Sequence, residues 1–496
     1  MAESSSDNNV MFNVLKTIAV EGGMPRAGRL SLPKRKPIDT PNYIGLSSRG
    51  AIPHMTPDVI SKHVELNGSY MALEDFVERS QKRTQPAVFN IDGAGKDALH
   101  AYTATPEPLA IVLGARRHPA VVAPMGNGKD YVSIYTSTGF QKLKNSEFYR
   151  AIERLQPDIA IPLADLTFGN AHIRTKLPNQ KRQLRMVERT EDWLSEFIKL
   201  RNTDNESEST ASMPSLFAPL LPVAYPTQWE YINRLSQDYV QHLSGLAVYD
   251  ADILPDLMNH ESVDSLPRLS MDFITSPQEI LRQVRLGMDV FTVTFLNAAS
   301  DAGIALTFSF PPPPGTAVTN PLGIDMWSQD HQVSLKPLVD GCECYACTKH
   351  HRAYLQHLLN AKEMLGWTLL QIHNHHILSE FFKDIRATVI AEPSTFERDC
   401  DAFFNAYESV LPKGTGERPR ARGYHFKTEG GQSSRINPPA WEKFGEGGTE
   451  DSTLAGEIAG LAVTGATAEG GETPLVPDDG TDAKELDRKG FAEIDK

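Results

Sequence analysis

Residues 342–376 read CECYACTKHHRAYLQHLLNAKEMLGWTLLQIHNHH, and the interpretation of the whole chain starts from this stretch. Three of the four cysteines in the chain, Cys342, Cys344 and Cys347, lie close together, and His373 follows after one long helical segment. Three thiolates and one imidazole form a closed, tetrahedral Zn²⁺ site, which leaves no position for a catalytic water. The spacing therefore predicts a structural zinc site that joins a loop to a helix. The alternative is three buried cysteines and a core histidine.

Composition indicates an ordinary globular protein in a reducing compartment. The chain has 496 residues, 40% of them hydrophobic and 23% charged, and only four cysteines, which argues against a disulfide framework. The first residues, MAESSSDNNVMF, lack the basic and apolar regions of a signal peptide. No run approaches the roughly 18 apolar residues of a membrane span. We expect a soluble intracellular protein.

The net charge of −14 is unevenly distributed along the chain. Residues 429–496 hold fifteen acidic and six basic side chains, a balance of −9, so the other 428 residues carry −5. Basic clusters of this kind either contact phosphates or form a solvated helix face with ordinary charge pairs, and the second interpretation is the better supported. The clusters are Lys34-Arg35-Lys36, Arg116-Arg117-His118, and the group Arg174, Lys176, Lys181, Arg182, Arg185 and Arg189.

From residue 12 to about residue 390, short apolar runs alternate with helical patterns. This alternation predicts βα units around a parallel sheet, either a (β/α)₈ TIM-type barrel or, as the fallback, a doubly wound sheet. The apolar runs are 120–125, 131–135, 159–163, 246–249, 290–295 and 304–310. The helical patterns are 146–155, 180–200, 228–243, 276–286 and 351–365, and Ser276-Pro277 is a favourable helix start.

Composition also sets the domain boundaries that we expect. Residues 1–10 read as a disordered leader, and 411–496 as an acidic, largely disordered tail with few large apolar residues. Residues 11–410 form the barrel, with a zinc-binding subdomain inserted at about 325–400. Two further segments, 204–215 and the proline run 311–314, read as loops.

The zinc loop resembles that of the queuine/archaeosine tRNA-ribosyltransferases, the tRNA-guanine transglycosylase family. The resemblance covers most of residues 12–390 and implies a (β/α)₈ barrel with a zinc subdomain near its C-terminal end. The amino-terminal segment AGRLSLP…IDTPNYIGLSSRGAIPHMTPDVI is similar to that of the family. Four short motifs follow in the family's order: YTSTGFQ (135–141), PLADLT (162–167), SGLAV (244–248) and LGMDVFTVTF (286–295).

The departures from the family pattern decide the predicted function. Catalytic members attack the ribose C1′ with an aspartate, and that position corresponds to Thr292 here. The second catalytic aspartate corresponds to Thr136. A threonine hydroxyl is neutral and, without an adjacent base, a poor nucleophile. Gly323-Ile324-Asp325-Met326 looks locally like the nucleophile motif, but it leads into the zinc loop, and Ser328 would then take the nucleophile's place.

Other family elements are missing as well. Leu296–Ala299 replaces the basic segment after the nucleophile, and Pro222–Ala224 stands near the place of a Q-G-G base-recognition motif. Asp165 survives at the base-recognition aspartate position, although one acid cannot complete the chemistry. The family spacing selects His373 as the metal ligand, and we expect His375 and His376 to be surface residues. Cys400 is expected to be a partly buried free thiol.

The resemblance therefore implies a non-catalytic subunit that holds one structural Zn²⁺ and pairs with a catalytic queuine tRNA-ribosyltransferase subunit. This heterodimer would act on tRNA with a GUN anticodon. The implied location is the cytoplasm, or the periphery of the mitochondrial outer membrane, without a transmembrane segment. Two alternatives remain. One is a self-sufficient transglycosylase that uses another acid, such as Asp165, Asp272 or Asp325. The other is a zinc-stabilised protein that binds queuine or tRNA.

Overall fold

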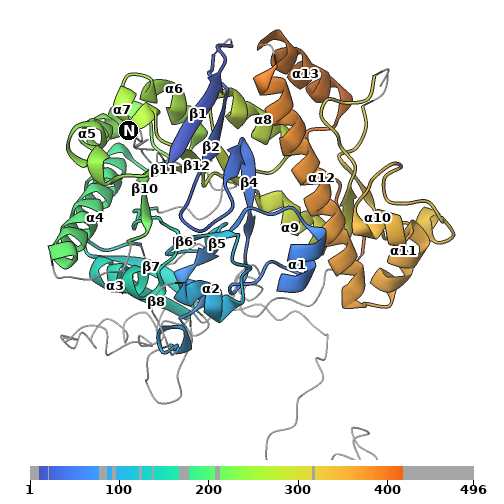
Figure 1. Ribbon diagram of the computed structural model, residues 1–496, viewed down its shortest axis with the longest axis horizontal. Helices are drawn as coiled ribbons and strands as arrows, with labels where there is room; N and C mark the ends of the chain where they lie inside the picture. Colours follow the sequence, from blue (N-terminus) through green and yellow to red (C-terminus); the bar gives the residue numbers. More distant parts are fainter. Residues whose placement is uncertain are drawn as a thin grey trace, which may run out of the picture. The chain divides into compact units, whose positions relative to one another are not determined.

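The computed structural model describes residues 11–20, 22–77, 86–91, 97–121, 126–136, 139–166, 178–206, 213–314, 319–391 and 393–416. The expected disordered leader and almost all of the expected acidic tail lie outside these residues, so both remain predictions. A closed barrel of eight parallel strands forms the centre of the described part, and helices surround it (Figure 1). This confirms the (β/α)₈ barrel and excludes the doubly wound sheet.

The barrel strands pair in a ring in which each strand is parallel to both neighbours. The hydrogen-bonded order is β10-β11-β12-β13-β4-β5-β6-β9, and β9 closes the ring by pairing with β10. In chain order the strands are β4 (Asn42–Leu46), β5 (Gly68–Ala72), β6 (Ala110–Gly114), β9 (Ile159–Ala160), β10 (Ser215–Leu220), β11 (Gly245–Val248), β12 (Arg268–Ser270) and β13 (Val290–Thr292).

Helices follow the barrel strands and cover the outside of the barrel. They are α1 (Pro57–His63), α2 (Ala98–Thr103), α3 (Asn145–Leu155), α4 (Gln180–Glu206), α5 (Tyr225–Arg234), α6 (Leu254–Leu257), α7 (Glu261–Asp264), α8 (Pro277–Arg285) and α9 (Thr294–Asp301). Successive strand residues face opposite sides, so neighbours belong to different cores. Tyr43 packs in the outer core between strands and helices, whereas Ile44 belongs to the cluster inside the barrel.

An antiparallel sheet and a buried ion pair lie at the amino-terminal end of the barrel. The sheet consists of β1 (Phe12–Thr17), β2 (Arg26–Leu30) and β3 (Ile38–Thr40). Arg26 donates from Nε to Asp289 at 2.9 Å, and both side chains are almost completely buried. This end of the barrel is therefore occupied by structural contacts, and the carboxyl end is left for a functional site, as in other TIM-type barrels.

After the barrel closes, the chain forms a ribbon and a helical region. The ribbon pairs β14 (Ile304–Leu306) with β15 (Gly323–Asp325), and the helices are α10 (Tyr345–Lys349), α11 (Arg352–Asn360), α12 (Met364–Ile390) and α13 (Pro393–Ala406). Helix α12 contacts β4 and α9 of the barrel and also contacts α10 and α11, so it lies between the two regions (Figure 1).

Several predicted elements differ from the observed ones. The run 131–135 forms β7 (Tyr131–Thr136), which pairs with β8 (Gly139–Lys144) in a hairpin outside the barrel, and the run 304–310 forms β14 of the ribbon. Residues 120 and 121 are not a strand, and 122–125 lie outside the described residues. An apolar run indicates burial, and burial occurs equally in hairpins that pack on the barrel.

Helix boundaries needed smaller corrections. Helix α4 extends to Glu206, into the segment expected to be a loop, and 207–212 lie outside the described residues. The helical pattern 351–365 is two helices, α11 and the start of α12, because the chain turns between them at Lys362, which has a positive φ of 58°. Ser276 is the N-cap of α8, but its side chain makes no capping hydrogen bond. The proline run 311–314 is a loop, as predicted.

Candidate metal centre and barrel mouth

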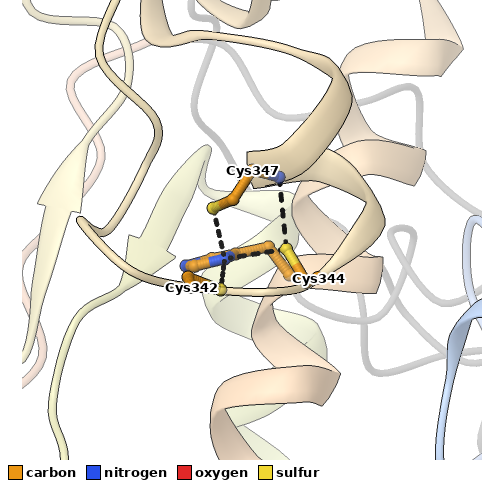
Figure 2. A group of neighbouring side chains, drawn as sticks. Cys342, Cys344 and Cys347 are labelled. Atoms are coloured by element: carbon orange, nitrogen blue, oxygen red, sulfur yellow. Dashed lines mark hydrogen bonds between the residues drawn. The ribbon is translucent and has the colours of Figure 1, made fainter.

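The predicted zinc ligands converge on one point between a loop and helix α12. Cys342 precedes α10, Cys344 is its N-cap, Cys347 lies in its first turn, and His373 projects from α12. The four ligand atoms all lie within 4.8 Å of one another. Figure 2 shows the three labelled cysteines around a single imidazole ring. The structure therefore brings together the four residues that the sequence selected, and this group could hold a metal ion.

The distances fit a tetrahedral ion. The His373 Nδ1 atom lies 3.7 Å from the sulfur of Cys342, 3.5 Å from that of Cys344 and 3.4 Å from that of Cys347. A tetrahedral ion with metal–sulfur bonds of about 2.3 Å and a metal–nitrogen bond of about 2.0 Å places sulfur and nitrogen about 3.5 Å apart. The cluster therefore has the dimensions of a three-thiolate, one-imidazole metal site.

A second contact orients the histidine. The Nε2 atom of His373 lies 2.9 Å from the carbonyl oxygen of Leu306 in β14. This oxygen accepts a hydrogen bond from Nε2–H, which leaves Nδ1 unprotonated and directed toward the sulfurs. Histidine ligands commonly have such a partner on the other ring nitrogen, and it fixes both tautomer and orientation. The Leu306 carbonyl is a part of the site that the sequence motif does not reveal.

The expectation that His375 and His376 lie on the surface is wrong. His375 is fully buried between α12 and the barrel, with Nδ1 3.0 Å from the Tyr43 hydroxyl and Nε2 3.2 Å from the Gln371 amide. Burial lowers the pKa of His375 to about 3. His376 is half-buried, and a hydrogen bond to Cys342 raises its pKa against the effect of burial. His375 lies on the face of α12 that packs against the barrel, whereas His376 lies beside Cys342 and is only partly covered.

Cys400 is separate from the metal cluster. It lies on α13, is 4% exposed and forms no disulfide. Burial raises the pKa of its thiol to about 12, so the thiol stays protonated and unreactive at neutral pH. The expectation of a free thiol is confirmed, and the residue is more completely buried than predicted.

A small cavity lies at the carboxyl end of the barrel. Its volume is about 90 Å³, and its lining comes from residues at the ends of six barrel strands, including Tyr70, Ala115, Leu163, Pro222 and Tyr249. An enclosed cavity of about 150 Å³ accommodates benzene, so the enclosed part of this cavity is smaller than a two-ring base. Asp272 is the only acid among the described residues that line the cavity.

The two threonines at the expected catalytic positions are buried and already hydrogen-bonded. Thr292 ends β13, and its hydroxyl donates to the carbonyl oxygen of Ser270 at 2.7 Å. Thr136 ends β7, and its hydroxyl donates to the carbonyl of Gly139 at 3.0 Å while it accepts from the Gln141 amide at 3.0 Å. Backbone carbonyls cannot remove a proton, so these contacts do not activate either hydroxyl as a nucleophile.

The three acids named as alternatives lie in different environments. Asp165 is fully buried and accepts hydrogen bonds from Asn127 and Arg182. Asp325 lies on β15 beside the metal region, where it accepts from the hydroxyl and amide of Thr415. Asp272 follows β12 and accepts from the amide of Phe273 at 2.8 Å. Among the three, Asp272 alone lines the barrel-mouth cavity.

Most of the basic clusters form internal charge pairs. Arg35 pairs with Asp158 at 2.7 Å, and Arg117 pairs with Glu74 at 3.1 Å, with both arginines buried. Arg182 and Arg189 pair with Asp165. Lys181 and Arg185 are exposed, whereas Arg174 and Lys176 lie outside the described residues. Ordinary charge pairing is therefore the observed state of the clusters' buried members.

The Asp165 network is the feature that sequence reasoning missed. Arg182 and Arg189 are seven residues apart on α4, so they lie on the same face of the helix, and this spacing is a signal that was present in the sequence. The positions of Asn127 and Arg116, which complete the network, come from loops and carry no comparable signal.

Residues 21–409 match the family described as queuine tRNA-ribosyltransferase. A Schizosaccharomyces pombe protein is 32% identical over 439 residues, which cover 87% of this chain and 92% of the relative. Relatives from Culex quinquefasciatus and Drosophila mojavensis are 27% and 26% identical, with 76% of this chain covered in both cases and 87% and 88% of the relatives. All three are named queuine tRNA-ribosyltransferase accessory subunit 2. Within the described residues, no helix has the length and apolar character to cross a membrane.

Proposed function

Because this chain belongs to the queuine tRNA-ribosyltransferase family, we propose that it is the non-catalytic subunit of a heterodimeric queuine tRNA-ribosyltransferase. The complex would exchange guanine for queuine at the wobble position of tRNAs with GUN anticodons, and the partner would supply the catalytic aspartates. The observation that carries this proposal is the state of Thr292. It ends the last barrel strand, where the family resemblance places the nucleophile, and its hydroxyl is held by a backbone carbonyl.

The chemistry explains why this substitution matters. Displacement of a base from ribose needs a nucleophile that is anionic at neutral pH and that can leave again from C1′. A carboxylate has both properties. The Thr292 hydroxyl has neither property. It is neutral, and it donates its hydrogen bond to the backbone carbonyl of Ser270, which is not a general base. Thr136 is likewise bonded to Gly139 and cannot act as a carboxylate.

The metal site supports a structural role for Zn²⁺. Cys342, Cys344, Cys347 and His373 would hold the ion, and it would supply a cross-link between the loop before α10 and helix α12. Four protein ligands complete a tetrahedral site, so the ion would have no open position for substrate or water. One such ion per subunit would stabilise the fold around α12.

An apolar surface in the metal-binding region is a suitable contact for the partner subunit. Val333 and Leu335 are 86% and 76% exposed. The backbone amide of Ala353 donates to the carbonyl of Ser334 at 2.9 Å, which holds this loop beside the start of α11 and its exposed Tyr354. Contiguous exposed apolar side chains commonly mark protein interfaces. We assign the partner contact to this surface. The cytoplasmic or mitochondrial-surface location remains a prediction.

Co-purification with a catalytic queuine tRNA-ribosyltransferase subunit tests the heterodimer. The tagged chain should bring down the partner, with a mass by native mass spectrometry that equals one copy of each. The variant Val333→Asp/Leu335→Asp should lose the partner while keeping its zinc and its melting temperature. Met258→Asp is the matched control, because Met258 is 54% exposed but lies on the barrel after α6. Failure of the wild-type chain to capture the partner would overturn the proposal.

One observation favours a second candidate, a self-sufficient transglycosylase. Asp272 is a carboxylate at the cavity and follows a barrel strand, as catalytic groups of this fold do. A covalent adduct between RNA and Asp272, found by mass spectrometry and absent in Asp272→Asn, would establish this alternative. A third candidate, a zinc-stabilised protein that binds queuine or tRNA alone, requires a stable monomer that binds one of these ligands and never the catalytic subunit.

A further inference from the structure

Asp165 is the most completely enclosed acid at the barrel mouth. It follows β9, its side chain is fully buried, and it lies between Ala164 and Leu166, which line the cavity. Its Oδ1 atom accepts from Arg182 Nη2 at 2.7 Å and from the Asn127 amide at 2.7 Å. Its Oδ2 atom accepts from Arg189 Nη1 at 3.1 Å. Both carboxylate oxygens are therefore occupied by protein donors.

The donors form a connected network. Arg189 also donates to the backbone carbonyl of Asn127 at 2.9 Å, and Asn127 in turn accepts from Arg116 Nη2 at 2.6 Å. The side chains of Arg182 and Arg189 are each 23% exposed, whereas Asp165 is not exposed at all. The arginines thus separate the carboxylate from solvent on the α4 side.

The chemistry of the two guanidinium groups resembles that of one class of base. A guanidinium group presents parallel N–H donors to a carboxylate. Guanine and 7-deazaguanine bases present a comparable pair, the ring N1–H and the exocyclic amino group. Adenine and cytosine do not, because an acceptor nitrogen stands beside their amino group. A carboxylate that binds guanidinium can therefore bind the guanine edge but has no matching contact with these other bases.

We propose that Arg182 and Arg189 act as an internal plug that occupies Asp165 and excludes guanine-type bases from this subunit. Two arginines on one face of α4 take the hydrogen bonds that a base would otherwise make. In the proposed heterodimer, the plug restricts base binding to the partner, so this chain does not compete for the free base. The inference concerns the isolated chain, and its failure would leave the partner proposal untouched.

Removal of the plug tests the inference. The probe is isocytosine, a one-ring base with the donor edge of guanine, and cytosine is its control. Isothermal titration should show no isocytosine binding to the wild-type chain. The double variant Arg182→Ala/Arg189→Ala should bind isocytosine at least about tenfold more tightly than the weakest affinity that the titration detects, because a charge-assisted hydrogen bond contributes that much. Cytosine should not bind, and adding Asp165→Asn to the double variant should abolish isocytosine binding.

A second, milder variant keeps the test decisive if the double variant does not fold. Removal of both partners of a buried acid costs about 3–5 kcal/mol or more, so Arg182→Ala alone, which keeps Arg189 and Asn127, is measured in parallel. If the double variant does not fold and the single variant does, the comparison of isocytosine binding is made between Arg182→Ala and the wild type. A merely structural ion pair would lower the melting temperature without creating binding. The inference is overturned if a folded variant binds isocytosine no better than wild type, or if the wild-type chain binds it through Asp165.

Discussion

The metal cluster and the barrel mouth show opposite uses of polar side chains. At the cluster, three sulfurs and the Nδ1 atom of His373 face a common centre, and the hydrogen bond from Nε2 to the Leu306 carbonyl orients the imidazole toward that centre. At the mouth, the hydroxyl of Thr292 and the carboxylate of Asp165 are bonded to neighbouring protein groups. Groups that converge on an empty point can bind a ligand, whereas groups that satisfy one another stabilise the fold. The metal region could therefore hold an ion, whereas these groups at the mouth already have protein partners.

Loss of one metal ligand should have the largest effect. Cys344→Ser should remove stoichiometric zinc and lower the free energy of unfolding by about 5 kcal/mol or more, since metal binding contributes directly to folding. Elemental analysis and thermal unfolding measure both quantities. The matched control is Cys400→Ser, because Cys400 is also a buried cysteine but lies on α13, outside the cluster. Retention of one zinc per chain in Cys344→Ser would contradict the assigned site.

A smaller effect is expected where α12 is fastened to the barrel. Asn374 donates to the Ser300 hydroxyl and the Ile304 carbonyl, both at 2.9 Å, and accepts from the Leu306 amide at 2.8 Å. Asn374→Ala leaves these buried groups unpaired and should cost about 3 kcal/mol in urea unfolding.

The metal should stay in place in the Asn374 variant. Its zinc content should equal that of wild type, since the His373 contact with Leu306 uses a different atom. Glu380→Gln, which breaks an exposed ion pair with Lys383 on the same helix, should change stability by less than about 0.5 kcal/mol. Loss of zinc from Asn374→Ala would show that the two regions are not separable.

The pH dependence of stability probes the mouth. His118 lines the cavity, and burial lowers its pKa to about 4. The hydrogen bond to the backbone carbonyl of Asp272 acts in the opposite direction but is the weaker effect. The unfolded chain therefore binds the proton more readily, and stability should fall as the pH drops from about 6.5 to about 4, by at most about 1.4 kcal/mol per pH unit. Urea unfolding of wild type and His118→Asn across this range measures the difference. Equal pH slopes would show that His118 is not held neutral.

Thr292 offers the smallest effect on stability and a sharp functional contrast. Thr292→Val removes one hydrogen bond to the Ser270 carbonyl and should cost about 1 kcal/mol. In the reconstituted heterodimer, this variant should exchange guanine as fast as wild type, because the hydroxyl takes no part in the reaction. Serine at the same position is the control that restores the hydroxyl. A slower exchange with valine that serine rescues would assign Thr292 a catalytic part.

The sequence predicted the barrel and the grouping of Cys342, Cys344, Cys347 and His373 well, and the mouth less well. Cysteine and histidine spacing identifies ligands directly, since few other roles require Cys342, Cys344 and Cys347 on one loop. An apolar run indicates that a strand is buried but does not indicate which strand it pairs with. For this reason β7 and β14 were expected to be barrel strands, although both lie outside the barrel. The Asp165 contacts depend on loops such as the one that holds Asn127, and loop conformation has no periodic signal.

Guanine exchange into tRNA by purified subunits tests the central contrast most directly. Radiolabelled guanine should enter tRNA when this chain and the catalytic subunit are mixed, and none should enter with this chain alone, even when its zinc content is complete. Exchange by the chain alone that Asp272→Asn abolishes would contradict the account, because it would place a working nucleophile at the mouth of this barrel.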